Sequence, residues 1–477
     1  MFFQRIKTPG LAHNAYLIAS NSIGIIIDPR RDIDEYLKLA SENGIAIKYV
    51  LETHRQEDFI LGSTALKETI GAQIIGGDHK FFKYCDIKLK EGQTLKIEDF
   101  TIRALHTPGH TPESMSYAFY LKDQDACWAV FTGDALFIGE AGRTDLPDKD
   151  KTGENAGILY DVLQTKILPL GPQTLLYPAH GSGSVCGGNI AEYDESTIGF
   201  ETQYNPAFTL SRDEFIESKL KERIPRPPYF TLMEELNLNG GSALIKNYHS
   251  IRIMKPKEFA EESKKGLVID TRLPEAYAGG HIPGSYSIWL EGLPVFGGYI
   301  AERDTKIYLV LERPEDIEKA FLYLSRIGMD KIEGAITGNF EKWRNEGLPI
   351  EFSGAETPAK LSERLDLYQI LDVREVSEFE EEGHIPGAQN CHVGSLGKFL
   401  DQYPITRPTL VTCSVGHRAS LAVSILLKKG YKNVSNLLGG MTAWKKSGLQ
   451  MEEKEDKNSF YYQNENTKPE FFENQLH

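Results

Sequence analysis

Residues able to bind a metal ion stand directly after short apolar runs of this chain. Thr53-His54-Arg55-Gln56-Glu57-Asp58-Phe59 follows the apolar run Tyr49-Val50-Leu51 as a loop follows the end of a buried strand. His54 offers an imidazole nitrogen and Asp58 a carboxylate oxygen, and both are common ligands of transition metals. The segment therefore predicts a metal site.

Three later strand-like runs end in the same kind of side chain. The segments 105–114, 129–134 and 174–181 place His110, Asp134 and His180 after apolar residues. Taken alone, each is a weak signal, because an isolated His or Asp after a strand more often makes a turn or a helix cap.

Taken together, His54, Asp58, His110, Asp134 and His180 resemble the metallo-β-lactamase superfamily in order and context, over about residues 1 to 245. The resemblance implies a sandwich of two mixed sheets flanked by helices. The superfamily signature is His-x-His-x-Asp-His, and Gln56 and Phe59 replace its second and last histidines here. Gln56 is a poor ligand and Phe59 is none, so we expect one metal ion rather than two.

Further motifs resemble those of the persulfide dioxygenases: Gly142-Arg143-Thr144-Asp145, Tyr177-Pro178-Ala179-His180 and Asn205-Pro206. The resemblance implies one Fe(II) per N-terminal domain, held by His54, His110 and Asp134. Two histidines and one carboxylate leave three positions open on the iron, enough for a persulfide sulfur and O2 together. The implied partners are therefore a small thiol persulfide and O2.

Four other residues of this region are candidates for contacts outside the metal's coordination sphere or with substrate. Asp58 would orient a ligand's imidazole, and His180 would bond to substrate or water; alternatively, Asp58, Asp134 and His180 hold the metal. Arg143 either binds the carboxylate of a thiol or forms a structural ion pair. Tyr177 belongs to the same group through its motif.

Cys186 lies in the glycine-rich loop 181–188 that directly follows His180. So many glycines indicate close backbone approach, so Cys186 is a candidate catalytic residue that faces the metal pocket. A similar loop occurs in persulfide dioxygenases fused to rhodanese domains, where it would accept or present persulfide sulfur. The alternative is a buried thiol that packs a tight loop, and we expect Cys85, Cys127 and Cys391 to be structural.

The second half of the chain repeats itself. Val268-Ile269-Asp270-Thr271-Arg272 precedes a Gly-His-Ile-Pro-Gly motif at 280–284, and Ile370-Leu371-Asp372-Val373-Arg374 precedes one at 383–387. The histidines of these motifs are 384 − 281 = 103 residues apart. Both copies resemble rhodanese domains, which implies two parallel α/β sheets.

The second copy carries a cysteine where a rhodanese has its nucleophile. The loop from Cys413 to Arg418 follows the strand-like Thr409-Leu410-Val411-Thr412 and precedes a helix-like segment. Backbone N–H groups at a helix start, with Arg418 adding charge, would stabilise a thiolate or a persulfide. In the first copy the matching residue is Leu311, so we expect an inactive domain that serves as scaffold or interface.

Composition and breaks in the chain give the organisation. Its 477 residues predict about three domains, and the Pro-rich 225–228 and the Gly240-Gly241 pair indicate a boundary. We expect a dioxygenase-like domain at 1–242, an inactive rhodanese-like domain at 243–352, an active rhodanese domain at 353–452 and a polar tail at 453–477. The aromatic residues of this tail could dock on a neighbouring subunit, and we expect a homo-oligomer.

The charge balance limits the partners. A net charge of −15 argues against nucleic acid and against an anionic membrane, which both need a basic face. Five cysteines argue against a disulfide scaffold. We expect a cytoplasmic protein, since no apolar signal core or transit-like segment is found.

The sequence thus predicts an α/β protein with a metallo-β-lactamase αββα sandwich followed by two rhodanese-like domains. The resemblance implies an iron enzyme of sulfide detoxification that oxidises a thiol persulfide to sulfite and forms thiosulfate through Cys413. One alternative is a zinc-dependent thioester hydrolase similar to glyoxalase II, fused to a sulfurtransferase. Another is a sulfur carrier or sensor in which only Cys413 works.

Overall fold

The computed structural model describes residues 1–243, 251–338, 340–400 and 407–452. The chain divides into two compact units, residues 1–245 with 326–328 and the remainder. The 453–477 tail lies outside the described residues, so the expected homo-oligomer stays a prediction. None of the described helices combines the length and the apolar composition that a membrane crossing requires.

The first unit is built on two six-stranded mixed sheets. In the first sheet the strands pair in sequence order: β1 (Phe2–Thr8), β2 (His13–Ser20), β3 (Ile23–Ile27), β4 (Ala46–Leu51), β5 (Gln73–Gly77) and β6 (Ile87–Leu89). In the second sheet the order is β12 (Ser196–Thr197), β11 (Leu175–Pro178), β10 (Cys127–Gly133), β9 (Met115–Leu121), β8 (Phe100–His106) and β7 (Thr94–Ile97).

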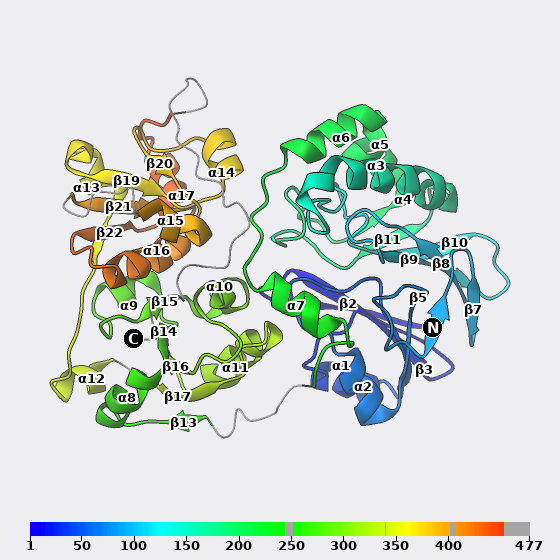
Figure 1. Cartoon of the computed structure of the whole chain (residues 1–477), viewed down its shortest axis with the longest axis horizontal. Helices are drawn as coiled ribbons and strands as arrows, with labels where there is room; N and C mark the ends of the chain where they lie inside the picture. The colour runs from blue at the N-terminus through cyan, green and yellow to red at the C-terminus, as the bar shows by residue number, and fades with distance from the viewer. Residues whose placement is uncertain (244–250, 339, 401–406, 453–477) are drawn as a thin grey trace. The chain divides into compact units, whose positions relative to one another are not determined.

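Helices cover the outer faces of both sheets (Figure 1). Those beside the first sheet are α1 (Asp34–Glu42) and α2 (Ser63–Ile70), and α7 (Phe230–Asn237) follows later in the chain. Those beside the second sheet are α3 (Thr152–Val162), α4 (Ile198–Tyr204), α5 (Pro206–Thr209) and α6 (Arg212–Lys221). A core of alternating apolar side chains joins the facing sheets, including Ile18, Ile102 and Phe131. This layering confirms the αββα sandwich.

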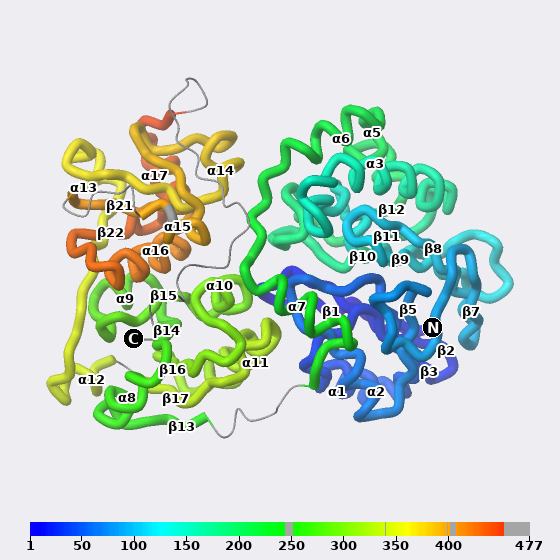
Figure 2. Tube along the Cα trace, in the orientation of Figure 1, coloured from blue at the N-terminus to red at the C-terminus, as the bar shows by residue number. Residues whose placement is uncertain are grey.

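The second unit contains two five-stranded parallel sheets of one topology. The first has the order β13 (Arg252–Ile253), β17 (Ile332–Ile336), β16 (Ile307–Val310), β14 (Leu267–Asp270) and β15 (Tyr286–Ser287). The second has the order β18 (Gly354–Glu356), β22 (Val434–Leu437), β21 (Thr409–Thr412), β19 (Gln369–Asp372) and β20 (Gln389–Asn390). Each sheet uses one continuous stretch of chain (Figure 2).

The helices of this unit also repeat. In the first copy they are α8 (Pro256–Glu262), α9 (Pro274–Ala278), α10 (Leu293–Ile300), α11 (Asp316–Arg326) and α12 (Glu341–Asn345). In the second copy they are α13 (Pro358–Ser362), α14 (Val376–Glu381), α15 (Leu396–Phe399), α16 (His417–Lys428) and α17 (Gly440–Lys446). The parallel α/β fold class is thereby confirmed.

The repeated sequence motifs have a structural task. Arg374 donates hydrogen bonds to both carboxylate oxygens of Asp372 and, at 2.8 Å, to the carbonyl of Gly383. Arg272 makes the corresponding bonds to Asp270 and Gly280. A buried guanidinium needs paired acceptors. This set of bonds, which we call the lock, ties the end of β14 or β19 to the Gly-His-Ile-Pro-Gly turn of the same copy.

Candidate functional site

The structure brings His54, His110 and Asp134 together. They follow β4, β8 and β10, all are fully buried, and their ligand atoms lie within 4.8 Å of one another. The Nε2 atoms of His54 and His110 lie 3.7 and 3.5 Å from Oδ2 of Asp134. The three residues form a group that could hold a metal ion.

A hydrogen-bond relay fixes the His54 ring. Thr53 donates its N–H and its hydroxyl to the two carboxylate oxygens of Asp28, at 2.9 and 2.8 Å. The same hydroxyl oxygen lies 2.9 Å from Nδ1 of His54, so it accepts the Nδ1–H and leaves the Nε2 lone pair facing Asp134. Burial lowers the pKa of His54 to about 3, so the ring is neutral and able to ligate.

A backbone carbonyl fixes the second imidazole. Nδ1 of His110 lies 2.9 Å from the carbonyl oxygen of Arg143, which accepts its proton. Among the described residues neither Nε2, of His54 or of His110, has a hydrogen-bond partner. Buried polar atoms are rarely left unpaired, so two converging orphan nitrogens beside a carboxylate fit a bound cation.

Gly133 allows the backbone to approach Thr53 and His54 closely. Its φ is +55°, and a Cβ there would lie 2.5 Å from Oγ1 of Thr53 and 3.2 Å from Nδ1 of His54. Glycine alone combines this left-handed conformation with the absence of a side chain.

His180 bridges two carboxylates. Its Nδ1 lies 2.8 Å from Oδ1 of Asp134, and its Nε2 lies 3.0 Å from Oδ2 of Asp58. Burial opposes a charge on this ring, but the charges of Asp134 and Asp58 raise the pKa of His180 well above its usual range. Because both nitrogens are occupied, His180 is placed to orient Asp134 from outside the coordination sphere.

Cys186 completes a second group of possible ligands with Asp58 and His180, and all three are buried. Its side chain also packs with Phe137 and Ile190. Cys186 therefore lies beside possible metal ligands and is also a buried thiol in a tight loop, as the two sequence interpretations separately predict. Burial and the carboxylates of Asp58 and Asp134 raise the pKa of the Cys186 thiol well above its usual range. The thiol is therefore neutral at physiological pH.

The Cys413 loop has the geometry of an anion-binding turn. Cys413 follows β21, and its Sγ accepts N–H groups from Gly416 at 3.1 Å and from Ala419 at 3.4 Å. These donors lie at the start of α16, where the helix dipole also favours negative charge. A thiolate or a sulfur-bearing cysteine is stabilised here.

Arg418 contributes less free charge to this loop than the sequence predicts. Its guanidinium forms two hydrogen bonds to Glu378, at 2.7 and 2.6 Å, and one to Ser414. Although burial acts against it, the bonds from Arg418 lower the pKa of Glu378 to about 2. The pair is neutral overall, so the backbone donors carry the electrostatic effect at Cys413.

The first rhodanese-like copy has a leucine where the second has Cys413, and it contacts the second copy. Asp270 pairs with Val310 as Asp372 pairs with Thr412, so strand register makes Leu311 the counterpart of Cys413. The Trp289 ring stacks on that of His417, in the Cys413 loop, with centroids 4.7 Å apart. These contacts fit the scaffold role expected for this copy.

Comparisons with known proteins match each half of the chain to a family. The Metallo-beta-lactamase superfamily matches residues 8–180, and the Rhodanese-like domain matches residues 255–346 and 357–447. Persulfide dioxygenase ETHE1, mitochondrial, of Mus musculus is 30% identical over 223 residues, which are 46% of this chain and 79% of that protein. The chain belongs to the metallo-beta-lactamase superfamily, fused to two rhodanese-like domains.

Other members of the superfamily are nearly as similar. Hydroxyacylglutathione hydrolase of Pelagibacter ubique is 28% identical over 257 residues, covering 50% of this chain and 93% of the hydrolase. A metallo-beta-lactamase structure from Staphylococcus aureus superposes with a TM-score of 0.63 at 26% identity, covering 71% of this chain and 99% of that one. These similarities establish the superfamily and the fusion to rhodanese-like domains, and relatives with two different reactions share them.

Two residues predicted near the metal of this superfamily domain point elsewhere. Arg143 directs its guanidinium to Asp145, at 2.7 and 2.8 Å, and to the carbonyls of Val185, Ile224 and Pro225. That is the arrangement of a structural ion pair, whereas the Arg143 carbonyl holds His110. The Tyr177 ring lies in the aromatic core, 5.3 Å from Phe131 between centroids.

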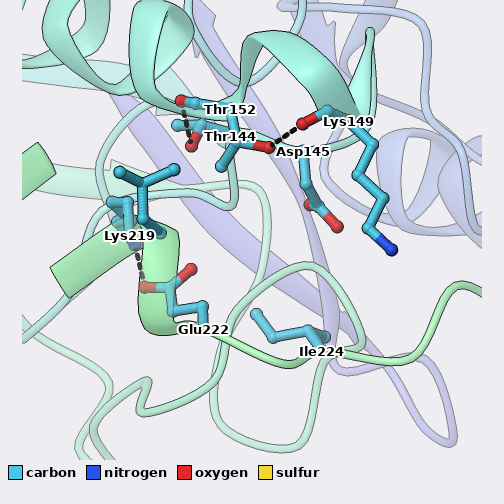
Figure 3. Close-up of a pocket in the computed structure, with 8 residues that line it drawn as sticks. Thr144, Asp145, Lys149, Thr152, Lys219, Glu222 and Ile224 are labelled. Carbon is cyan, nitrogen blue, oxygen red and sulfur yellow. Dashed lines mark hydrogen bonds and ion pairs between the residues drawn. The ribbon is translucent and has the colours of Figure 1, made fainter. Parts of the chain in front are cut away.

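A small pocket of about 170 Å³ adjoins the Arg143–Asp145 ion pair (Figure 3). Asp145 and Lys149 line it, and Lys219 is bonded there to Glu222 at 2.6 Å. His54, His110 and Asp134 do not line this pocket.

Sequence reasoning missed three residues of the metal region: Asp28, Thr53 and Glu57. The signal for Asp28 was its place after the apolar run 23–27, at the same end of the sheet as His54. Glu57 carried no signal, since it occupies a variable position of the signature, yet its carboxylate faces both imidazoles.

Proposed function

We propose that the chain is a persulfide dioxygenase joined to a sulfurtransferase. The observation that carries this proposal is the buried group of two imidazoles and one carboxylate, in a chain whose Cys413 sulfur also accepts a backbone N–H hydrogen bond. Likeness to the mouse persulfide dioxygenase supports it. We also propose that the protein is cytoplasmic.

His54, His110 and Asp134 would hold one Fe(II). Bound Fe(II) supplies electrons for O2 and open positions for O2 and for the persulfide sulfur. The overall reaction is RSSH + O2 + H2O → RSH + SO3²⁻ + 2 H⁺. The chain's own residues supply the positioning: Thr53 and the Arg143 carbonyl keep each Nε2 directed inward, and His180 holds Asp134.

Cys413 would perform the second reaction. A persulfide on Cys413 would be held by the N–H groups of Gly416 and Ala419, which donate to Sγ of Cys413. Sulfite attacks the outer sulfur and the S–S bond breaks, so that Cys–S–SH + SO3²⁻ gives Cys–SH + S2O3²⁻. The leaving thiolate is stabilised by the same two donors.

The test is oxygen consumption by protein loaded anaerobically with iron, on addition of glutathione persulfide, with sulfite and thiosulfate assayed afterwards. We expect uptake that disappears in His110→Ala. Coenzyme A and bacillithiol persulfides extend the test to other thiols. Absence of uptake with all three, in protein of confirmed iron content, contradicts the proposal.

A zinc-dependent thioester hydrolase is the second candidate. The group formed by Asp58, His180 and Cys186 favours it, because a second ion there would give the paired metals of a hydrolase. The similarity to hydroxyacylglutathione hydrolase points the same way. Thioester hydrolysis by zinc-loaded protein, without oxygen uptake by iron-loaded protein, would establish this alternative.

A further inference from the structure

Glu57 is a buried carboxylate beside the metal-ligating group, and the proposed ligand set does not use it. Its side chain is 1% exposed. Oε2 of Glu57 lies 3.8 Å from Nε2 of His54 and 3.5 Å from Nε2 of His110. In the described part of the chain, none of these three atoms has a hydrogen-bond partner.

The spacing is slightly wider than that of ligands around one bound ion, and it is equally so for the proposed ligand Asp134. With bonds of about 2.1 Å, neighbouring ligand atoms lie roughly 3.0 to 3.4 Å apart in octahedral or tetrahedral geometry. Asp134, a proposed ligand, lies 3.7 and 3.5 Å from the same two nitrogens. Glu57 therefore stands toward the two imidazoles as Asp134 does.

Gln56, the neighbour of Glu57 in this loop, does not point at the metal position. The superfamily signature would have a histidine at position 56, where this chain has Gln56. Nε2 of Gln56 lies 3.4 Å from Nδ1 of His54, away from the ring nitrogen that faces the metal position. Asn237 of α7 holds the loop by donating to the carbonyls of Gln56 and Phe59, at 2.7 and 2.8 Å.

Within the ranges that the structure describes, Oε2 of Glu57 has no hydrogen bond at this depth, and the basic side chains that face it are the His54 and His110 imidazoles. Leaving one buried polar group unsatisfied costs about 1 to 3 kcal/mol, and more for a charged one. Arg55, the nearest cation in sequence, is bonded instead to Glu113 at 2.9 Å. A cation between Glu57, His54 and His110 would satisfy all three orphan atoms at once.

We propose that Glu57 is a fourth protein ligand of the metal ion, in place of the histidine that the signature has lost. The site would then contain two imidazoles and two carboxylates. This inference rests on the metal site of the proposed function, though not on its reaction.

The fourth ligand changes what the metal can bind. A six-coordinate ion with four protein ligands keeps two open positions instead of three. Substrate sulfur and O2 would then fill the coordination sphere and leave no position for water. Two carboxylates also balance the charge of a divalent ion in a buried site, where net charge is costly.

The experiment uses Co(II) as a spectroscopic probe of the full chain. Metal-free wild type, Glu57→Gln and Glu57→Ala are titrated anaerobically with Co(II) in competition with a chromophoric chelator, and the visible absorption bands are recorded. We expect both variants to bind Co(II) at least about 100-fold more weakly, the upper limit for groups that only orient a ligand. We also expect altered bands, since these report the ligand set.

The matched control is Glu52→Gln. Glu52 is equally buried and also has an unpaired oxygen, but it is bonded to Tyr84 rather than directed at the imidazoles. This variant should retain the affinity and the bands of the wild type. Far-ultraviolet circular dichroism confirms that each variant is folded.

The inference requires both changes in Glu57→Gln. Wild-type affinity overturns it, and so does an unchanged spectrum at reduced affinity, because Glu57 would then act from outside the coordination sphere. His110→Ala separates this failure from failure of the metal site itself: Co(II) binding that survives in His110→Ala would place the ion elsewhere.

Discussion

Substitution of Gly133 by alanine should weaken metal binding beyond its cost to the fold. Gly133 has a φ of +55°, and its missing Cβ would lie 2.5 Å from Oγ1 of Thr53. An ordinary contact starts near 3.4 Å, so Thr53 must withdraw by about 0.9 Å, the difference of 3.4 and 2.5. The 2.9 Å hydrogen bond from His54 to Thr53 would then break.

The size of the effect follows from two separate costs. Loss of a partner that orients a metal-bound histidine weakens metal affinity by about 10- to 100-fold, which corresponds to about 1.4 to 2.8 kcal/mol. The left-handed backbone costs about 1 to 2 kcal/mol of folding free energy with a Cβ present, and the contact with Thr53 adds about 1 to 3 kcal/mol.

The assay is anaerobic competition for the metal with a chromophoric chelator, beside urea unfolding of the metal-free proteins. Gly71→Ala is the control, because Gly71 has a φ of +70° and its Cβ would meet nothing within 4 Å. It should lower stability by the backbone cost alone and leave metal affinity unchanged. Wild-type affinity in folded Gly133→Ala, or an equal loss in Gly71→Ala, would refute the reasoning.

Three other predictions concern the two halves of the chain. Cys413→Ser should abolish sulfur transfer from thiosulfate to cyanide and leave oxygen uptake intact, whereas Cys391→Ser, at a buried site, should retain both activities. Elemental analysis of iron-loaded protein should find one ion per chain, and two would assign the second to the group of Asp58. Acid should destabilise the second rhodanese-like domain between about pH 4.5 and pH 2, because Glu378 has its pKa lowered from 4.5 to about 2. The ion pair of Glu378 with Arg418 contributes fully above pH 4.5 and is lost as pH falls through 2. Glu378→Gln should remove that part of the pH dependence in unfolding curves recorded by rhodanese activity.

Strand ends were the most predictable part of the structure. His54, His110 and Asp134 each follow a short apolar run, and the sheet geometry brings the ends of those runs together. The repeat in the second half was equally predictable from the sequence. The residues that serve the fold, such as Asp372 and Arg374, have the same residue types in both copies.

Directions of side chains within loops were not predictable. The sequence left Arg143 open between a substrate contact and a structural ion pair, and only the structure shows its guanidinium bonded to Asp145 and to three carbonyls. Glu57 and Gln56 are neighbours in one loop, but only Glu57 faces both imidazole Nε2 atoms. Such choices depend on contacts with distant elements, as Asn237 of α7 shows by holding this loop.

The lock between Asp-x-Arg and the Gly-His-Ile-Pro-Gly turn supports the fold and does not depend on the cysteine. Arg272 keeps its bonds to Asp270 and Gly280 in the copy where Leu311 replaces the nucleophile. These residues therefore serve the fold in a copy that has no cysteine at this position. A survey that counts such motifs would predict two sulfurtransferases in this chain, whereas only the second copy has a cysteine at the end of its central strand.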